Sequence, residues 1–240
     1  MIPLPYGLSS LKTGFRMSDI KACVLIPAYN EAAHIGQVVA VARQFLPVLV
    51  VDDGSSDDTA VKAEMNGAEV IRQVPNQGKG AALRAGFRRS IQLEMEAVIT
   101  LDADGQHDPA EIPHFLQAYQ ESRSGLIIGR RDFSSMPFTR KLANTLGGRI
   151  ISLALGQPIP DNQSGYRLIS ARLAEKLLPS QESGFEFEVE MLALCLKHNL
   201  SLGWVPIRTI YADEKSHIRP LHHVLHYFRI VSHARHILTS

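Results

Sequence analysis

Short apolar runs alternate with amphipathic segments from residue 22 to residue 131, and this order constrains the fold more than any other feature of the chain. Each apolar run has the length of one buried strand, and each intervening segment has the spacing of a helix with one apolar face. Strands that alternate with helices are typical of βαβ units, so the pattern predicts an α/β fold with a mainly parallel central sheet flanked by helices. The predicted strands are 22–29, 48–53, 68–73, 96–102 and 125–130, and the predicted helices are 31–45, 57–66, 78–92 and 109–122.

The alternation is lost after residue 130, where a polar segment interrupts it. Beyond this segment we predict further elements of the same sheet, which we interpret as a lid and a platform for a second substrate. The predicted strands are 164–170 and 202–211, and the predicted helices are 140–155, 171–178, 186–199 and a stretch from 219. We therefore expect a loose leader over 1–19, one large α/β domain over 20–218 and an amphipathic C-terminal helix over 219–240.

Composition limits the partners that we expect. Lys and Arg number 25 and Asp and Glu number 24, so the formal net charge of +1 does not indicate a nucleic-acid partner. No stretch approaches 18 uninterrupted apolar residues, and the first 20 residues hold no apolar core of a signal peptide, so we expect neither a membrane span nor a secretory signal. Cys23 and Cys195 both lie in apolar runs, and two reduced core cysteines fit a cytoplasmic protein.

Acidic and amide side chains follow the ends of successive predicted strands. If the sheet is parallel, these ends meet at one edge, which is where open α/β sheets bind ligands. Asp102 and Asp104 repel each other unless a cation lies between them, which favours a divalent metal, but a turn closed by Asp and Gly accounts for the same residues. Both interpretations stay open at this point. The residues concerned are Pro27, Tyr29, Asn30 and Glu31 at the end of the first strand, Asp52 and Asp53 at the end of the second, and Asp102, Asp104 and Gln106 at the end of the fourth.

A glycine-rich loop, NQGKGAA over residues 76–82, follows the third predicted strand and opens a helix. Backbone N–H groups at such a helix start can hold a phosphate, although glycines also suit a simple tight turn. The spacing is not that of a P-loop, and no GxGxxG follows the first strand. Nucleotide binding would therefore depend on an acidic group for a ribose or base and on a metal for a pyrophosphate.

Eight ordered segments between residues 22 and 218 carry a resemblance to a known family. They are VLIPAYNE, VVDDGSSDDT, NQGKGAALRAGF, LDADGQHDP, IIGRR, DNQSGYRLIS, GFEFEVEM and VPIRTIY. In this order and spacing they resemble the family 2 glycosyltransferases, and most closely the dolichol-phosphate mannose synthase and polyprenyl-phosphate glycosyltransferase branch. The resemblance implies the GT-A fold and a nucleoside diphosphate sugar, of the GDP-mannose or UDP-glucose type, bound together with Mg²⁺ or Mn²⁺.

The resemblance also assigns roles to individual residues. The metal ligands that it implies are Asp102, Asp104 and Gln106. The donor-binding residues that it implies are Pro27, Tyr29, Glu31, Asp52, Asp53, Lys79 and Asp102, with Asp52 or Asp53 on the base or ribose. The residues that we expect to take part in the transfer itself are Asp104, Arg130, Arg131 and Arg140.

The chemical class of the acceptor decides which further groups are needed. A phosphomonoester has its second pKa near ~6 and is already anionic at neutral pH, so it needs positive charge and no strong base, whereas a hydroxyl needs a general base. The resemblance favours an inverting transfer to a polyprenyl (dolichyl or undecaprenyl) phosphate. The alternatives are transfer to a sugar or lipid hydroxyl in cell-envelope glycan synthesis, and a non-catalytic sugar-nucleotide-binding protein. Candidate phosphate-binding residues are Arg130, Arg131, Arg140, Lys141, Arg167 and Arg219, and candidate bases are Asp161, Glu186 and Glu188.

The segment from Lys215 to Ser240 contains no acidic residue, and its apolar residues recur at helical spacing. This pattern predicts an amphipathic helix with a weakly basic face, suited to an anionic bilayer surface. The alternative is a helix that packs its apolar face on its own domain or on a second subunit. We therefore expect a cytoplasmic protein. If the helix binds the bilayer, the protein is peripheral on the cytoplasmic face of the membrane; if the helix packs on protein, it covers its own domain or joins two subunits of a homodimer.

Overall fold

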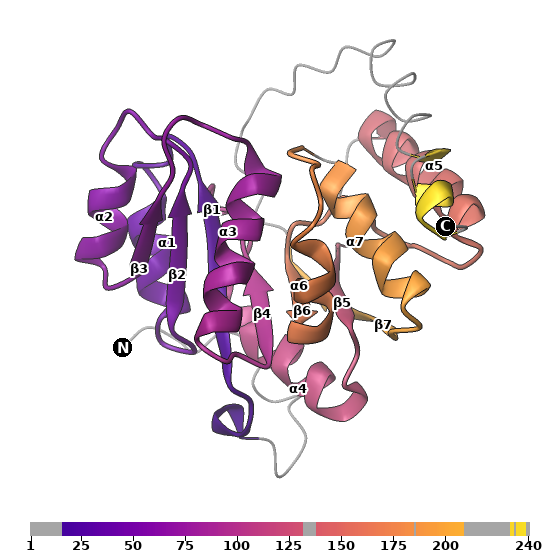
Figure 1. Cartoon of the computed structure of the whole chain (residues 1–240), viewed down its shortest axis with the longest axis horizontal. Helices are drawn as coiled ribbons and strands as arrows, with labels where there is room; N and C mark the ends of the chain where they lie inside the picture. The colour runs from indigo at the N-terminus through magenta and orange to yellow at the C-terminus, as the bar shows by residue number, and fades with distance from the viewer. Residues whose placement is uncertain (1–15, 132–137, 185, 209–230, 233, 239–240) are drawn as a thin grey trace.

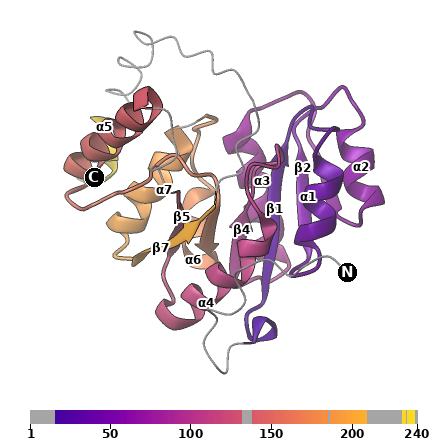
Figure 2. The ribbon, with the colours of Figure 1, turned by 180° about the vertical axis from the view of Figure 1, so that it is seen from behind.

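The computed structural model describes residues 16–131, 138–184, 186–208, 231–232 and 234–238. Within them, seven strands form one sheet in the order β3-β2-β1-β4-β6-β5-β7, with helices on both faces (Figures 1 and 2). The strands are β1 (Ala22–Ala28), β2 (Val48–Asp52), β3 (Glu69–Arg72), β4 (Ala97–Thr100), β5 (Leu126–Arg131), β6 (Arg167–Ser170) and β7 (Leu202–Ile207). The predicted α/β architecture with a mostly parallel, helix-flanked sheet is confirmed.

In the described part of the chain, seven α-helices precede the helical residues of the C-terminal end. They are α1 (Ile35–Ala42), α2 (Thr59–Met65), α3 (Lys79–Gln92), α4 (Ile112–Ser122), α5 (Phe138–Leu155), α6 (Ala171–Leu177) and α7 (Glu186–Lys197). Successive strand residues point to opposite faces of the sheet, so Val24 and Ile26 of β1 join the apolar cluster under α1, α2 and α4. Cys23 and Leu25 join the cluster under α3, α5, α6 and α7.

Several element ends differ from the predicted ones. The first two helices begin later than predicted, at Ile35 and Thr59, and α7 ends earlier, at Lys197. The helix predicted from residue 109 starts with a 3₁₀ turn, Pro109–Glu111, before α4. These shifts lie in the turns at the ends of the elements, where apolar periodicity carries little information.

One strand departs from the predicted parallel arrangement. β6 runs antiparallel between β4 and β5, and its first residue, Arg167, pairs with Thr100 on one side and Ile128 on the other. The sequence predicts β6 as a strand, but its apolar pattern does not define a direction. Because β6 is reversed, the loop before it, residues 156–166, reaches the same edge of the sheet as the carboxyl ends of β1, β2, β4 and β5.

The described end of the C-terminal tail packs on its own domain. Residues 231–232 and 234–238 are helical and lie beside α5 in both ribbon views (Figures 1 and 2). Ala234 is 1% exposed and Ile237 9% exposed, and both belong to the cluster under α5, α6 and α7. Residues 219–230, which carry most of the predicted amphipathic helix, lie outside the described residues. No helix in the described part of the chain is long and apolar enough to cross a bilayer.

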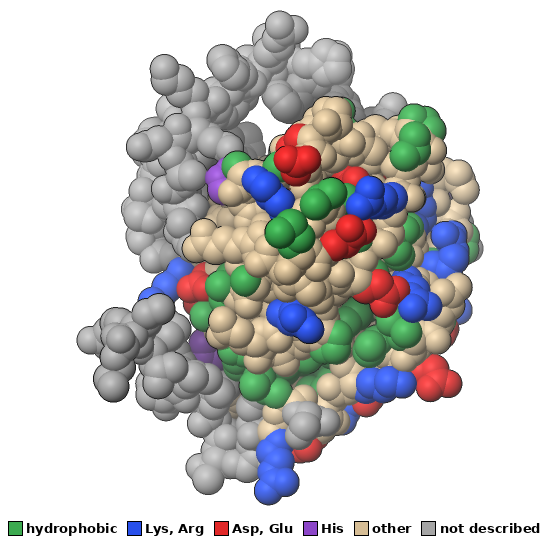
Figure 3. Space-filling model, turned by 90° about the vertical axis from the view of Figure 1, so that its left-hand side faces the viewer, with side chains coloured by type: hydrophobic (Ala, Val, Ile, Leu, Met, Phe, Trp, Pro, Cys, Tyr) green, Lys and Arg blue, Asp and Glu red, His purple; other side chains and the backbone are tan. Residues whose placement is uncertain are grey.

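The face formed by α2 and the edge strand β3 carries side chains of both charges, interspersed with apolar ones (Figure 3). Two ion pairs account for part of this mixture, Arg72 with Glu64 at 3.0 Å and Arg89 with Glu69 at 2.6 Å. Glu69 and Arg72 are the exposed ends of β3, and charges on an edge strand oppose pairing with another chain. Among the described residues of this face, charges of a single sign do not gather into a patch.

Candidate active site

The carboxyl ends of β1, β2 and β4 meet the beginning of β6 at one edge of the sheet. The register shows this directly, because Ala28 pairs with Asp52 and Thr100 pairs with Arg167. A small hollow opens at this edge and draws its walls from segments that are far apart in the sequence. Its lining residues are Pro27, Lys79, Leu83, Thr100, Asp102, Gly165, Arg167, Glu188 and Met191.

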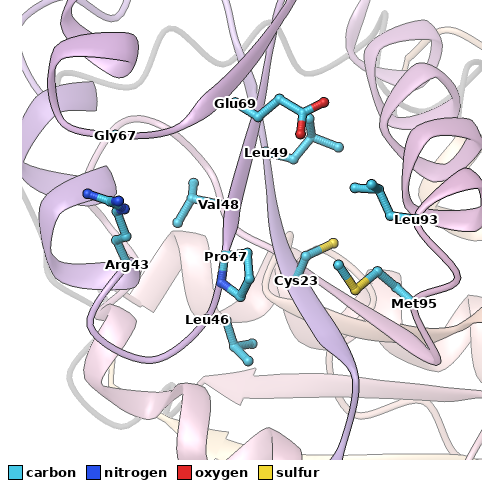
Figure 4. A pocket seen from close by; sticks show the side chains of 10 residues that line it. All are labelled: Cys23, Arg43, Leu46, Pro47, Val48, Leu49, Gly67, Glu69, Leu93 and Met95. Carbon is cyan, nitrogen blue, oxygen red and sulfur yellow. The ribbon is translucent and has the colours of Figure 1, made fainter.

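A larger hollow, of about 400 Å³, lies at the opposite edge of the sheet, between the first residues of β1, β2 and β3 (Figure 4). Its lining is mostly apolar and includes Cys23, Leu49 and Met95. Burial, helped by the charge of Glu69, raises the pKa of the Cys23 thiol to about 12, so this thiol stays protonated and is a poor nucleophile. Because the acids that the sequence singles out lie at the other edge, the smaller hollow is the candidate active site.

The loop after β4 presents Asp102, Asp104 and Gln106 at this edge. Leu101 and Ala103 are 0% and 4% exposed and anchor the loop in the core, whereas the three polar side chains between and after them are partly exposed. The Asp104 carboxylate accepts a hydrogen bond of 2.9 Å from the Gln106 backbone N–H. The residues therefore form a turn, and Asp102 also lines the hollow, so the two sequence interpretations are compatible.

Lys79 connects the acidic loop to α7. Its Nζ lies 2.7 Å from Asp102 Oδ1 and 3.0 Å from Glu188 Oε1. Burial lowers the pKa of Lys79, but the carboxylates of Glu188 and Asp102 outweigh this effect and raise that pKa above its usual value. Burial raises the pKa of Asp102, but the positive charge and the hydrogen bond of Lys79 outweigh it and hold that pKa below its usual range. The Lys79 ammonium and the Asp102 carboxylate are therefore both charged at neutral pH.

His107 is a site residue to which the sequence reasoning assigns no role. It is 6% exposed, its Nδ1 accepts a 3.4 Å hydrogen bond from the Asp102 backbone N–H, and its ring lies 5.3 Å from that of Tyr166. Burial lowers the pKa of His107, and the charges of Asp102 and Asp104 offset only part of this effect. His107 therefore stays neutral at pH 7 and supports the loop that carries Asp102. Its place directly after DADGQ is the one signal that could have indicated this role.

The loops after β1 and β2 are tied to each other. The Asn30 side chain accepts a 2.8 Å hydrogen bond from the Ser56 N–H, and the Asn30 N–H donates to Ser55 Oγ at 2.8 Å. The Glu31 N–H donates to Thr59 Oγ1 at 2.8 Å, at the start of α2. This bracing holds the predicted donor-binding residues of the two loops near one another. Of these, Pro27 lines the hollow, Tyr29 is 51% exposed and Asp52 is 6% exposed.

The glycine-rich loop packs against two other segments of the chain. The N–H groups of Gln77 and Gly78 donate to the Asp53 carboxylate at 2.9 and 2.7 Å, and the Gly80 N–H donates to the Ser183 carbonyl at 2.8 Å. Gly78 has a φ of +90°, and a Cβ there would lie 2.8 Å from the Ser183 carbonyl oxygen. These three amides are therefore already occupied, which favours the tight turn of the two interpretations that the sequence leaves open, and Asp53 supports the loop.

Arg131 and Asp161 form a bidentate ion pair at the end of β5. Arg131 Nε and Nη2 lie 2.8 and 2.9 Å from the two carboxylate oxygens, and the Arg131 N–H donates to the same group at 3.2 Å. The side chains of Asp161 and Arg131 are 1% and 17% exposed. The predicted base Asp161 is thus paired with a cation, while Arg130 is exposed. Three further predicted acceptor-binding side chains lie outside the described ones, namely Arg140, Lys141 and Arg219.

Arg167 lies beneath the hollow and is 1% exposed. Its guanidinium donates to the carbonyl oxygens of Ser164, Glu188 and Asn162, at 2.8, 2.7 and 2.9 Å. Arg167 therefore fastens the loop before β6 to α7, and its predicted contact with an acceptor stays a prediction. Glu186 is half-buried in the first turn of α7, and its assignment as a base also stays a prediction.

The acidic loop fits a hard divalent cation that shares its coordination with a substrate. Among the described residues, no three His, Cys, Asp or Glu side chains converge as a complete metal site. Mg²⁺-type ions are commonly held by one or two carboxylates, with substrate phosphates and waters as the other ligands. Asp102, Asp104 and Gln106 would supply oxygen ligands of this kind from one short loop.

Gly165 allows the loop before β6 to approach the acidic loop closely, because a Cβ at this position would overlap the carboxylate of Asp102. We expect Gly165→Ala to displace that carboxylate and weaken Mn²⁺-dependent nucleotide binding by about 10- to 100-fold, as other changes to the support of a metal ligand do. Titration calorimetry with Mn²⁺ and a nucleoside diphosphate measures the effect.

Gly203→Ala in β7 is the matched control for this substitution. A Cβ at Gly203 would have its nearest neighbour at 3.3 Å, the Cγ1 atom of Ile127, far from the acidic loop. Equal nucleotide affinity of the two alanine variants would contradict the role assigned to Gly165.

Comparison with known proteins places the chain in a family. The profile described as "Glycosyl transferase family 2" matches residues 23–178. The chain is 32% identical over 224 residues to a UDP-N-acetylglucosamine–dolichyl-phosphate N-acetylglucosaminyltransferase of Methanococcus voltae, covering 82% of this chain and 88% of that protein. It is 31% identical over 203 residues to an undecaprenyl-phosphate mannosyltransferase of Micrococcus luteus, covering 78% and 83%.

Solved structures agree with this placement at the level of the fold. A glucosyl-3-phosphoglycerate synthase from Mycobacterium tuberculosis, bound to UDP, superposes with a TM-score of 0.70 over 94% of this chain and 86% of that chain, at 20% identity. Another structure of that synthase contains Mn²⁺, UDP and glucosyl-3-phosphoglycerate. The resemblance of the eight sequence segments is thus confirmed: the chain belongs to glycosyl transferase family 2 and is a glycosyltransferase with the GT-A fold.

Proposed function

We propose that this enzyme transfers a sugar from a nucleoside diphosphate sugar to a polyprenyl phosphate, with inversion at the anomeric carbon. The Methanococcus and Micrococcus relatives, at 32% and 31% identity, are both named for transfer to a polyprenyl phosphate, and this supports the acceptor. The synthase of similar fold is named for a different acceptor, so the fold by itself does not select one.

On the donor side, the acidic loop would hold Mg²⁺ or Mn²⁺ through Asp102, Asp104 and Gln106. When bound, such a metal acts as a Lewis acid on the charge that develops on the departing nucleoside diphosphate. The protein itself would bind the rest of the donor. We propose that the loops after β1 and β2 form the nucleotide pocket and that Lys79 binds the diphosphate. The nucleotide and sugar, GDP-mannose or UDP-glucose in type, form part of the proposal.

On the acceptor side, the observation that carries the proposal is the pairing of the buried acids. Asp161 is held by Arg131, and Glu188 lies 3.0 Å from the Lys79 ammonium. Each of these carboxylates is already occupied by a cation, whereas a hydroxyl acceptor needs a base within hydrogen-bond reach to take its proton. A phosphate acceptor is its own anionic nucleophile and needs only positive charge, which Arg130 and the paired Arg131 supply at the end of β5.

The remaining parts of the proposal concern the surroundings of the enzyme. We propose the division into a leader over 1–19, a catalytic domain over 20–218 and a C-terminal helix over 219–240. An acceptor with a polyprenyl chain requires contact with a membrane surface, so we place the enzyme at the cytoplasmic face, where nucleotide sugars are made. The helix over 219–240 would provide this contact, or would instead pack its apolar face on its own domain or on a second subunit.

We expect incubation with Mn²⁺, a polyprenyl phosphate and a panel of GDP- and UDP-sugars to give one β-linked polyprenyl phosphosugar from an α-linked donor. Inversion follows because a single displacement needs only one nucleophile, the acceptor phosphate. Mass spectrometry identifies the sugar that is transferred, and NMR of the product gives the linkage. The free polyprenol is the matched acceptor control. Transfer to the polyprenol but not to its phosphate, or an α-linked product, would refute the proposal.

A further inference from the structure

The cluster around Lys79 contains two cations and two anions in a confined space. The ammonium lies between Asp102 and Glu188, and the guanidinium of Arg167 lies 3.9 Å from the other Glu188 oxygen. The formal charges of these four groups sum to zero. The cluster is therefore balanced as it stands, and a divalent cation at Asp102 would leave it with an excess of positive charge.

Glu188 is the fixed member of this cluster. Its side chain is 8% exposed, and its backbone carbonyl accepts the 2.7 Å hydrogen bond from Arg167. Arg167 is itself held by two further carbonyls and is 1% exposed. The carboxylate of Glu188 therefore keeps its place beside a buried, immobile guanidinium.

Lys79 is the member that can move. Its side chain is 40% exposed, and it stands at the first residue of α3 on a flexible four-carbon stem. The glycine-rich loop packs against Ser183, and this contact holds the backbone beside Lys79 in place. Movement of the ammonium is therefore limited to the length of the Lys79 side chain and stays close to the hollow. Of its two partners, Asp102 is the predicted metal ligand and Glu188 is not.

We propose that Lys79 is a displaceable cation. In the metal-free enzyme the Lys79 ammonium neutralises and orients Asp102. When a metal binds at Asp102, the ammonium moves onto Glu188, and Glu188 then directs the ammonium toward the donor diphosphate. Glu188 is then a positioning residue that acts through Lys79. This inference rests on the proposed function, because the latter supplies the metal at Asp102. Like charges repel most strongly where water is scarce, so the ammonium and the metal do not share the Asp102 carboxylate.

The inference predicts opposite effects of Lys79→Met on two kinds of binding. Affinity for Mn²⁺ alone should rise about tenfold, because the competing ammonium is gone. Affinity for UDP or GDP in the presence of saturating Mn²⁺ should fall, because the diphosphate loses its lysine. Electron paramagnetic resonance of free Mn²⁺ measures the first quantity, and calorimetry with the nucleotide measures the second.

Two control variants separate this effect from a change in overall charge. Arg88→Met removes a positive charge from an exposed position of the same helix and should change the Mn²⁺ affinity less than about twofold. Lys79→Arg keeps a cation beside Asp102 and should leave Mn²⁺ binding as weak as in the wild type. If Lys79→Met does not fold, Lys79→Arg still tests the inference by itself. Tighter Mn²⁺ binding by Lys79→Arg than by the wild type would overturn the inference.

A double-mutant cycle with Glu188→Gln tests whether Glu188 positions the Lys79 ammonium. With Lys79 present, Glu188→Gln leaves the ammonium on Asp102 and should weaken Mn²⁺ binding; in the Lys79→Met background it should have little effect. Equal effects in both backgrounds, or no gain in Mn²⁺ affinity in Lys79→Met, would overturn the inference. If wild-type protein binds no Mn²⁺ even with UDP or GDP present, the metal site of the proposed function fails instead.

Discussion

Replacing Asp104 by Asn is expected to lower the transfer rate by about 100-fold or more and to abolish the effect of metal on donor binding. The substitution keeps the shape of the side chain, and an amide oxygen can still accept the hydrogen bond from the Gln106 N–H that closes the turn. What it removes is one of the two carboxylate charges of the acidic loop. Loss of a group that merely supports a metal ligand costs about 10- to 100-fold, so loss of the ligand charge itself should cost at least as much.

Asp108→Asn is the matched control, because it changes an acid in the same segment that lies outside the proposed ligand set. Asp108 Oδ1 accepts a 2.9 Å hydrogen bond from the Ala110 N–H, and asparagine serves equally well at such a position. Calorimetric titration of the nucleotide, with and without Mn²⁺, should show metal dependence in this control and in the wild type. Wild-type affinity that is the same with and without metal would remove the basis for the assignment of Asp104.

Replacing Arg131 by Ala is expected to destabilise the fold by about 3–5 kcal/mol, because it leaves the carboxylate of Asp161 buried without its cation. Asp161 is 1% exposed and cannot recover its hydration without a rearrangement of the loop before β6. For a domain of this size, that loss corresponds to a fall in melting temperature of about 6–20 °C. Differential scanning calorimetry measures it.

Two comparisons show whether the ion pair is the cause. The double variant Arg131→Met with Asp161→Asn removes both charges and should recover most of the lost stability. Arg130→Ala, at the exposed neighbouring position, should keep the wild-type melting temperature and raise the KM for polyprenyl phosphate roughly 10- to 150-fold, the equivalent of about 1.5–3 kcal/mol. A destabilisation of similar size in Arg130→Ala would show that loss of the Arg131–Asp161 ion pair does not explain the lower stability of Arg131→Ala.

The first half of the fold follows from the sequence because each of its strands is an apolar run between helices of clear periodicity. β1, β2 and β4 carry Asp and Asn at their carboxyl ends, and a parallel sheet has to bring these ends together. The direction and place of β6 do not follow, because a four-residue strand that is buried on both faces has the same apolar pattern in either direction. Its position between β4 and β5 is decided by tertiary packing.

The acids of the site are visible in the sequence, whereas their partners are not. DADGQ indicates a metal or a turn by its own spacing; the structure shows the turn, and the metal stays a prediction. The pairing of Lys79 with Glu188 joins residues 109 positions apart, and that of Arg131 with Asp161 joins residues 30 apart. Local periodicity contains no information on such contacts. For the same reason the sequence leaves open whether the glycine-rich loop offers its amides to a phosphate, since Asp53 and Ser183, which occupy three of them, lie elsewhere in the chain.

The reversed strand β6 has a consequence for the making of the protein. β4 and β5 do not pair with each other, and each pairs with β6 instead. During synthesis the chain grows by about 5–20 residues per second, so β3, β2, β1 and β4 can assemble while β6 has yet to leave the ribosome. Until it does, β4 presents an open row of N–H and C=O groups, the kind of edge along which chains aggregate. The arrangement that brings the loop before β6 to the candidate active site thus leaves the edge of β4 open to aggregation until residues 167–170 pair with it.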